Sequence, residues 1–137
     1  MAREILDASR IHTNIHKKLG YGKGSDAVKT IQQVREGAEN NAVLVVGMRQ
    51  NPVCKAVQKN LSKAGIEFKY LEYGSYLSQW QRRLAIKMWS GWPTFPMVFV
   101  NGVLVGGNHE VSGLLASGEF TAMLQQGAVS SSNVKAG

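Results

Sequence analysis

The chain is short of cysteine and of long apolar runs, and each shortage excludes a class of protein. Cys54 is the single cysteine, so no disulfide can form within the chain, which fits a reducing compartment. No run approaches the roughly 18 consecutive apolar residues of a transmembrane helix. Residues 1–18 lack the apolar core of a secretory signal. We therefore expect a cytoplasmic protein without a membrane partner.

Acidic residues are scarce as well. Nine Asp and Glu residues face 16 Lys and Arg residues, which gives a formal net charge of +7. Such an excess can favour nucleic acid, an anionic membrane surface or a small anionic ligand. Basic residues do not interleave with aromatic residues as they do in nucleic-acid-binding proteins, so we interpret the charge as a solvated basic face and expect no nucleic-acid partner. The 137 residues, 44% of them apolar, suffice for one domain with a modest core.

Composition divides the chain into three parts. Residues 1–25 form an extension with weak helical periodicity, followed by a glycine-rich connector. Residues 26–127 carry the domain, and residues 128–137 are small and polar, which predicts a disordered tail. His12 and His16 have the i, i+4 spacing of a helical metal site, but no carboxylate or cysteine completes it. We predict a surface pair there and no metal site.

Apolar periodicity predicts the elements of the domain. Ala42–Val46 is a continuous apolar run, as expected of a strand covered on both faces. A helix is predicted over Pro52–Gly65, because proline suits its first position and glycine its end. We place Trp80, Trp89 and Trp92 in the core or in a groove. The other predicted elements are a helix from Asp26 to Gly37, a strand over Glu67–Tyr73, a helix with the apolar stripe Leu77, Trp80, Leu84 and Met88, two strands after Pro96, and a closing helical region from Val111 to Met123.

The most informative block of the sequence is Trp92-Pro93-Thr94-Phe95-Pro96. Its Thr-x-Pro step suits a cis proline. An apolar run, the hairpin signal Asn101-Gly102, a second apolar run and Gly106-Gly107 follow. With the strand–helix–strand–helix order before it, this block predicts an α/β domain with a mixed sheet and helices on both faces.

At this block the chain resembles the glutaredoxins, a branch of the thioredoxin fold, and within them the monothiol class. Ser90-Gly91-Trp92-Pro93-Thr94-Phe95-Pro96 is close to the Ser-Asn-Trp-Pro-Thr-Phe-Pro of that class, and the resemblance covers roughly residues 27–125. It implies a four-stranded mixed sheet flanked by helices, here with an N-terminal helical extension.

The active-site slot of the monothiol class, usually Cys-Gly-Phe-Ser, falls on Asn51-Pro52-Val53-Cys54. The apolar stripe of Val57 and Leu61 sets this register and places Asn51 at the nucleophile position. Moving Cys54 to that position would shorten the helix and disrupt the stripe. In the family the nucleophile is a thiolate, which attacks glutathionylated proteins and, paired with glutathione, ligates a [2Fe–2S] cluster. Asn51 has no sulfur for either task, so we do not expect a cluster.

The resemblance also implies a glutathione site. Thr94-Phe95-Pro96 matches the segment whose backbone pairs with the cysteinyl part of glutathione. Arg83 matches a position that binds the glycine carboxylate. The family's lysine before the active site is absent, since Met48 stands near its position, and Arg49 could substitute for it. Gly107-Asn108-His109 matches the motif that holds the γ-glutamyl end, but without its acidic residue.

Three functions follow from these residues. The first is a glutaredoxin-like binding or adaptor module without the usual nucleophile, which holds glutathione or a protein partner in thiol redox or iron–sulfur metabolism. The second is an active glutathione-dependent thiol–disulfide oxidoreductase with Cys54 as its catalytic residue. The third is a [2Fe–2S] carrier, which Asn51 disfavours.

Overall fold

A mixed β-sheet with helices on both faces organises the computed structural model, which describes residues 3–4 and 26–126. A helical stretch over residues 119–126 follows the last labelled element. The elements are β1 (Arg3–Glu4), α2 (Asp26–Asn40), β2 (Val43–Gly47), α3 (Pro52–Lys63), β3 (Lys69–Glu72), α4 (Trp80–Ser90), β4 (Met97–Val100), β5 (Val103–Gly106) and α5 (Asn108–Ser117).

The sheet has the strand order β1-β5-β4-β2-β3, in which only β2 and β3 run parallel. The predicted four-stranded mixed sheet is therefore confirmed, and β1 adds a short fifth strand beside β5, with Arg3 paired to Leu104. At Arg3–Glu4 the strand β1 stands where the N-terminal extension was predicted to be helical. The rest of that extension, the His12–His16 pair and the tail at 128–137 lie outside the described residues.

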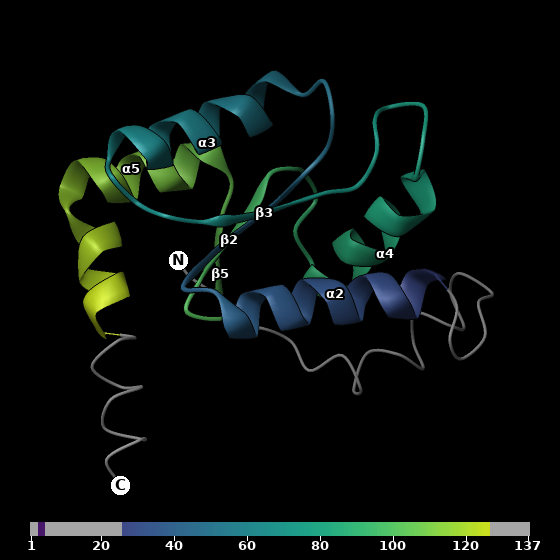
Figure 1. Cartoon of the computed structure of the whole chain (residues 1–137), viewed down its shortest axis with the longest axis horizontal. Helices are drawn as coiled ribbons and strands as arrows, with labels where there is room; N and C mark the ends of the chain where they lie inside the picture. Colours follow the sequence, from purple (N-terminus) through teal and green to yellow (C-terminus); the bar gives the residue numbers. More distant parts are fainter. Residues whose placement is uncertain (1–2, 5–25, 127–137) are drawn as a thin grey trace, which may run out of the picture.

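Two apolar layers hold the helices to the sheet, because neighbouring strand residues point to opposite faces. On one face, Leu44 and Met97 pack with residues of α2 and α4. On the other face, Val45 and Val98 pack with residues of α3 and α5. Figure 1 shows the same division, with α3 and α5 above the sheet and α2 below it, with α4 beside α2. Within residues 26–126 no helix has both the length and the apolar composition to cross a bilayer.

The predicted hairpin between β4 and β5 is confirmed. Asn101 and Gly102 both have positive φ angles, of 50° and 81°, as a two-residue turn of this kind requires. The turn sets the register, and Val100 faces Val103 across the two strands.

Two helix predictions need correction. Helix α2 continues past Gly37 to Asn40. Gly37 therefore lies within the helix, at a close approach to the sheet, where a Cβ would lie 3.1 Å from Leu44 Cδ1. The apolar stripe predicted for the helix from Leu77 to Met88 is wrong, since Leu77 precedes α4 and is 95% exposed. Trp80 is also exposed, whereas Trp89 lies in the core and stacks on Phe99. The buried face of α4 consists of Arg83, Ala85, Ile86, Trp89 and Ser90.

Candidate functional site

Asn51 immediately precedes α3 and caps it. Its backbone is extended, and its side-chain oxygen accepts hydrogen bonds from the N–H groups of Val53 at 2.9 Å and Cys54 at 3.0 Å. The first N–H groups of a helix have no partner within the helix, and asparagine is among the best residues to supply one. The Asn51 side chain thus satisfies, as a neutral group, the donors that stabilise a thiolate at a helix start.

The side-chain amide nitrogen of Asn51 binds a different segment of the chain. It donates to the hydroxyl of Tyr76 at 3.3 Å, in the loop between β3 and α4. Asn51 is 9% exposed, so both ends of its amide are used inside the fold. This bond joins the start of α3 to residues that follow β3.

Cys54 lies within the first turn of α3 and is buried, with 1% of its surface exposed. A Cβ at Gly47 would lie 3.0 Å from Cys54 Sγ and 2.7 Å from Tyr70 Oη, so thiol and phenol crowd the same strand backbone. Burial raises the pKa of the Cys54 thiol, and the Glu72 carboxylate adds to this, while a hydrogen bond to the Met48 backbone opposes it. The thiol is therefore protonated and shielded at neutral pH.

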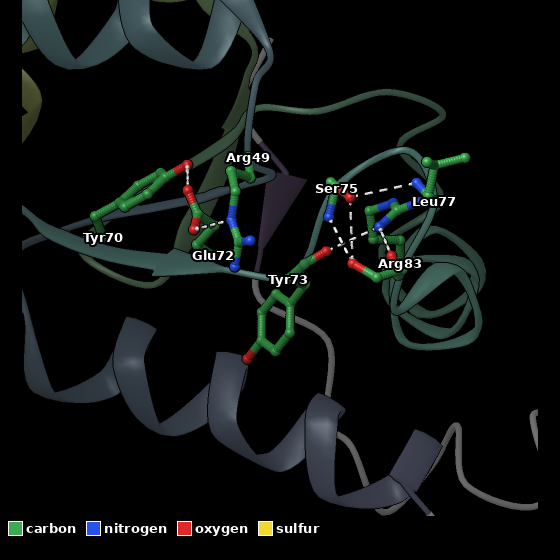
Figure 2. Close-up of polar contacts among 8 residues, drawn as sticks. Arg49, Tyr70, Glu72, Tyr73, Ser75, Leu77 and Arg83 are labelled. Carbon is green, nitrogen blue, oxygen red and sulfur yellow. Dashed lines mark hydrogen bonds and ion pairs between the residues drawn. The ribbon is translucent and has the colours of Figure 1, made fainter.

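Charged and phenolic groups of β3 stand near this thiol. Arg49 Nε lies 3.6 Å from a carboxylate oxygen of Glu72, whose other oxygen accepts from the Tyr70 hydroxyl at 3.4 Å (Figure 2). Burial raises the pKa of Tyr70, and the charges of Cys54 and Glu72 act in the same direction. The Arg49 side chain remains 63% exposed and accessible to an anionic ligand.

Arg83 is buried in α4 and holds the loop before it. One guanidinium nitrogen, Nη1, donates to the carbonyl oxygens of Tyr73 at 2.9 Å and Ser78 at 2.5 Å. Figure 2 shows Arg83 reaching both ends of this loop. The guanidinium that the family resemblance assigns to a glycine carboxylate therefore already has two partners in the fold.

The segment before β4 holds the predicted backbone site for glutathione. The Phe95–Pro96 peptide bond is cis, Thr94 is exposed, and Lys87 Nζ lies 5.7 Å from the centre of the Phe95 ring. A Cβ at Gly107 would lie 3.2 Å from the Pro96 carbonyl oxygen. Pro96 and Gly107, which the sequence places in two motifs, are thus brought together.

The residues after Gly107 have separate surroundings. Asn108 Oδ1 accepts from Asn60 Nδ2 at 3.0 Å, which ties α5 to α3. His109 is exposed and borders a cavity of about 630 Å³ between α5 and residues 119–126, with Leu114 and Met123 among its lining. Within residues 3–4 and 26–126 no group of three or more His, Cys, Asp or Glu side chains is placed to hold a metal ion.

Sequence reasoning missed two features of this site. The capping role of Asn51 was readable, because asparagine followed by proline is a common start of a helix. The contact of Asn51 with Tyr76 joins residues 25 positions apart, and no local pattern signals it.

Comparison with known proteins points to one family. The family model for glutaredoxin matches residues 43–105. A glutaredoxin-like protein of Dictyostelium discoideum is 56% identical over 77 residues, which cover 56% of this chain and 63% of that protein, or less than two thirds of its length. The probable monothiol glutaredoxin 2 of Rickettsia conorii is 33% identical over 102 residues, which cover 71% of this chain and 92% of the relative.

Solved structures give the same fold. A buckwheat glutaredoxin–glutathione complex superposes with a TM-score of 0.68 at 20% identity and covers 78% of this chain and 97% of that chain. The holo form of glutaredoxin C1 from Populus tremula x tremuloides has a TM-score of 0.65 at 27% identity, with coverage of 75% and 93%.

Proposed function

Because the chain belongs to the glutaredoxin family, we propose that it is a binding or adaptor module of this family rather than a thiol–disulfide oxidoreductase. In this proposal it holds glutathione, or an extended segment of a protein, within thiol redox or iron–sulfur metabolism of the cytoplasm. The compartment is supported by the single cysteine, which can form no disulfide within the chain.

One observation carries the proposal: the Asn51 side chain caps α3 where the family has its nucleophile. A carboxamide neither attacks a disulfide nor leaves as a thiolate. The one thiol of the chain, on Cys54, is buried one turn further on, and its raised pKa opposes nucleophilic attack. The alternative enzyme using Cys54 would need this turn of α3 to open.

The glutathione site is supported by charge and by placement. Glutathione carries two carboxylates, and the exposed Arg49 before α3 and the Lys87 ammonium near the Phe95 ring offer two cations. Thr94 is exposed and available for main-chain contacts. The buckwheat glutaredoxin of the same fold has been solved in complex with glutathione.

The side chains at the start of α3 do not fit an iron–sulfur cluster. Cluster iron takes deprotonated sulfur ligands. Asn51 supplies none, and Cys54 Sγ is packed against Gly47 and Tyr70 inside the fold. We therefore include no cluster in the proposed function.

The experiment is a titration of the full-length, ¹⁵N-labelled chain with glutathione and, separately, with S-methylglutathione. We expect both to shift the amide signals of Thr94 and Phe95 with similar affinity, because binding needs no free thiol. Lys63, at the far end of α3, is the internal control and should not shift. If neither compound moves Thr94 or Phe95 at millimolar concentration, the glutathione site of the proposed module is wrong.

A second arm distinguishes the enzyme. The native chain is incubated with oxidised glutathione and its mass is measured; we expect no adduct. Asn51→Cys in a Cys54→Ser background should gain the mass of one glutathione, because its thiol stands at the helix start. Rapid adduct formation on native Cys54 would instead favour the oxidoreductase.

A further inference from the structure

Large apolar side chains are exposed at one place beside the site. Among the described residues, the strongly exposed ones are Val53 at 45%, Tyr76 at 62%, Leu77 at 95% and Trp80 at 58%. Val53 lies in the first turn of α3, and the other three lie in or directly after the loop between β3 and α4. We call these four residues the Tyr76 surface.

The two segments that carry the Tyr76 surface are connected. The hydrogen bond from Asn51 Nδ2 to the Tyr76 hydroxyl joins the start of α3 to the loop. In Figure 1 the start of α3 and the loop before α4 lie toward the same end of the sheet. The two segments that carry the four side chains therefore lie at the same end of the molecule.

The loop is held in place by hydrogen bonds. Arg83 binds the carbonyl oxygens of Tyr73 and Ser78, and the Ser78 hydroxyl accepts from the Ser75 N–H at 3.0 Å. The Leu77 N–H donates to the Ser75 hydroxyl at 3.3 Å, as Figure 2 shows. A buried arginine and two serines thus fix a loop whose apolar side chains face solvent. Such preorganisation lowers the entropic cost of binding a partner.

Packing does not explain this exposure. Apolar surface left in water costs about 25 cal/mol per Å², and contiguous exposed apolar patches commonly mark interaction sites. Leu77 contributes almost nothing to the core at 95% exposure. The sequence therefore has leucine and tryptophan at positions where polar residues would serve the fold equally well.

Charge indicates what covers the surface. Residues 49–55 and 72–87 contain one acidic side chain, Glu72, against five cationic ones. Arg82 has Asp26 at 3.8 Å, and an exposed ion pair of this kind is weak in water. The five cations are Arg49, Lys55, Arg82, Arg83 and Lys87, of which Arg83 is buried and bound within the fold, so the other four can face a partner.

We propose that the Tyr76 surface docks an acidic segment of a partner protein that carries a large apolar side chain. The apolar anchor lies on Tyr76, Leu77 and Trp80, and the carboxylates of the segment face the surrounding arginine and lysine side chains. This inference rests on the proposed function as a binding module and names the chemistry of its protein partner.

The test uses the full-length ¹⁵N-labelled chain and two synthetic peptides. The probe is acetyl-Asp-Glu-Asp-Leu-Asp-Glu-Asp-amide, and the control replaces every acidic residue by lysine. We expect the acidic peptide to shift the amides of Val53, Tyr76, Leu77 and Trp80, and the basic peptide to leave them unchanged. Equal shifts with both peptides, or shifts that avoid these residues, overturn the proposal.

Variants locate the binding. Leu77→Ser with Trp80→Ser should weaken the acidic peptide at least tenfold without changing the melting temperature, because both side chains are exposed. Arg82→Glu should weaken binding of the acidic peptide several-fold. Lys59→Glu makes the same charge change about two turns beyond the start of α3 and should not weaken it. Equal losses for Arg82→Glu and Lys59→Glu, or displacement of the peptide by single-stranded RNA at lower concentration than the peptide itself requires, contradict a protein-docking surface.

The glutathione titration keeps the two proposals separate. Glutathione shifts at Thr94 and Phe95 without peptide shifts at Tyr76 reject the docking surface and leave the binding module intact. Peptide shifts without glutathione shifts reject the glutathione site and retain the docking surface.

Discussion

The side-chain oxygen of Asn51 accepts a hydrogen bond from the backbone N–H of Cys54 at 3.0 Å. Asn51, which the family resemblance aligns with the nucleophile position, and the one thiol-bearing residue are thus linked through a helix cap. A thiolate at the same position would draw on the same N–H groups and on the helix dipole for its stability. Here a neutral carboxamide uses them for folding, so the helix start contributes to stability rather than to acidity.

Removing the cap should destabilise the protein. We expect Asn51→Ala to lower the free energy of unfolding by about 1 kcal/mol, because the N–H groups of Val53 and Cys54 lose their acceptor. Asn51→Ser, which retains a capping oxygen, is the matched control and should lose less. Urea denaturation measures both; an alanine variant as stable as the parent would show that the cap contributes nothing.

The stability of the chain should depend on Cys54 in alkaline solution. Burial raises the pKa of this thiol, so the native state keeps a proton that the unfolded chain releases above its ordinary pKa of about 8.5. The unfolding free energy should therefore be unaffected below that pH and fall as the pH rises above it. Tyr73, whose pKa burial raises to about 12, acts in the same direction at higher pH.

Cys54→Ser isolates the thiol in this experiment. The variant should show a shallower loss of stability between about pH 8.5 and 10 than the parent, since serine does not ionise there. Iodoacetamide should label Cys54 slowly in the folded protein at neutral pH and at the rate of an exposed thiol when urea unfolds the chain. Fast labelling of the folded protein would mean that the thiol is not shielded.

Arg83 should govern the loop before α4. Replacing it by methionine removes the donor for two carbonyl groups, one of them on the buried Tyr73, and should cost about 1–3 kcal/mol. Hydrogen exchange at Ser75 and Leu77 should become faster in the same variant. Arg82→Met is the control and should stay within about 0.5 kcal/mol of the parent. Unchanged exchange in Arg83→Met would show that Arg83 does not hold the loop.

Gly47 is predicted to tolerate no side chain. A Cβ there would lie 2.7 Å from Tyr70 Oη and 3.0 Å from Cys54 Sγ, so Gly47→Ala should cost about 1–3 kcal/mol through overpacking. Gly113→Ala in α5 meets nothing within 4 Å and should stabilise the chain by about 0.5–1 kcal/mol. Thermal unfolding of the two variants should therefore shift in opposite directions, and equal shifts would contradict the packing around Gly47.

The sheet was predictable from sequence because its signals are local. Ala42–Val46 is a continuous apolar run, and Asn101-Gly102 specifies its own turn. The predicted apolar stripe of α4 is wrong, because Trp80 fits helical periodicity but the fold buries Ala85 and Trp89 instead. Tertiary packing decides which face of α4 is buried, and periodicity alone does not predict it.

The candidate site was predictable in part for the same reason. The start of α3 at Asn51 followed from Pro52 and the apolar stripe behind it, whereas the partners of Arg83 are backbone carbonyls that carry no residue identity. A contact with a carbonyl oxygen depends on the path of the chain. The sequence pattern of Arg83 is therefore the same for a carboxylate-binding arginine and for one that fixes a loop.

Strand β1 changes what the sheet presents to other molecules. The unpaired N–H and C=O groups of an edge strand are a template on which another chain can add a strand. Pairing of Arg3 and Glu4 with Leu104 and Val103 covers part of that row on β5. The opposite edge, β3, exposes the charged Lys69, and charge discourages the same addition. Both borders of the sheet therefore oppose aggregation through main-chain pairing.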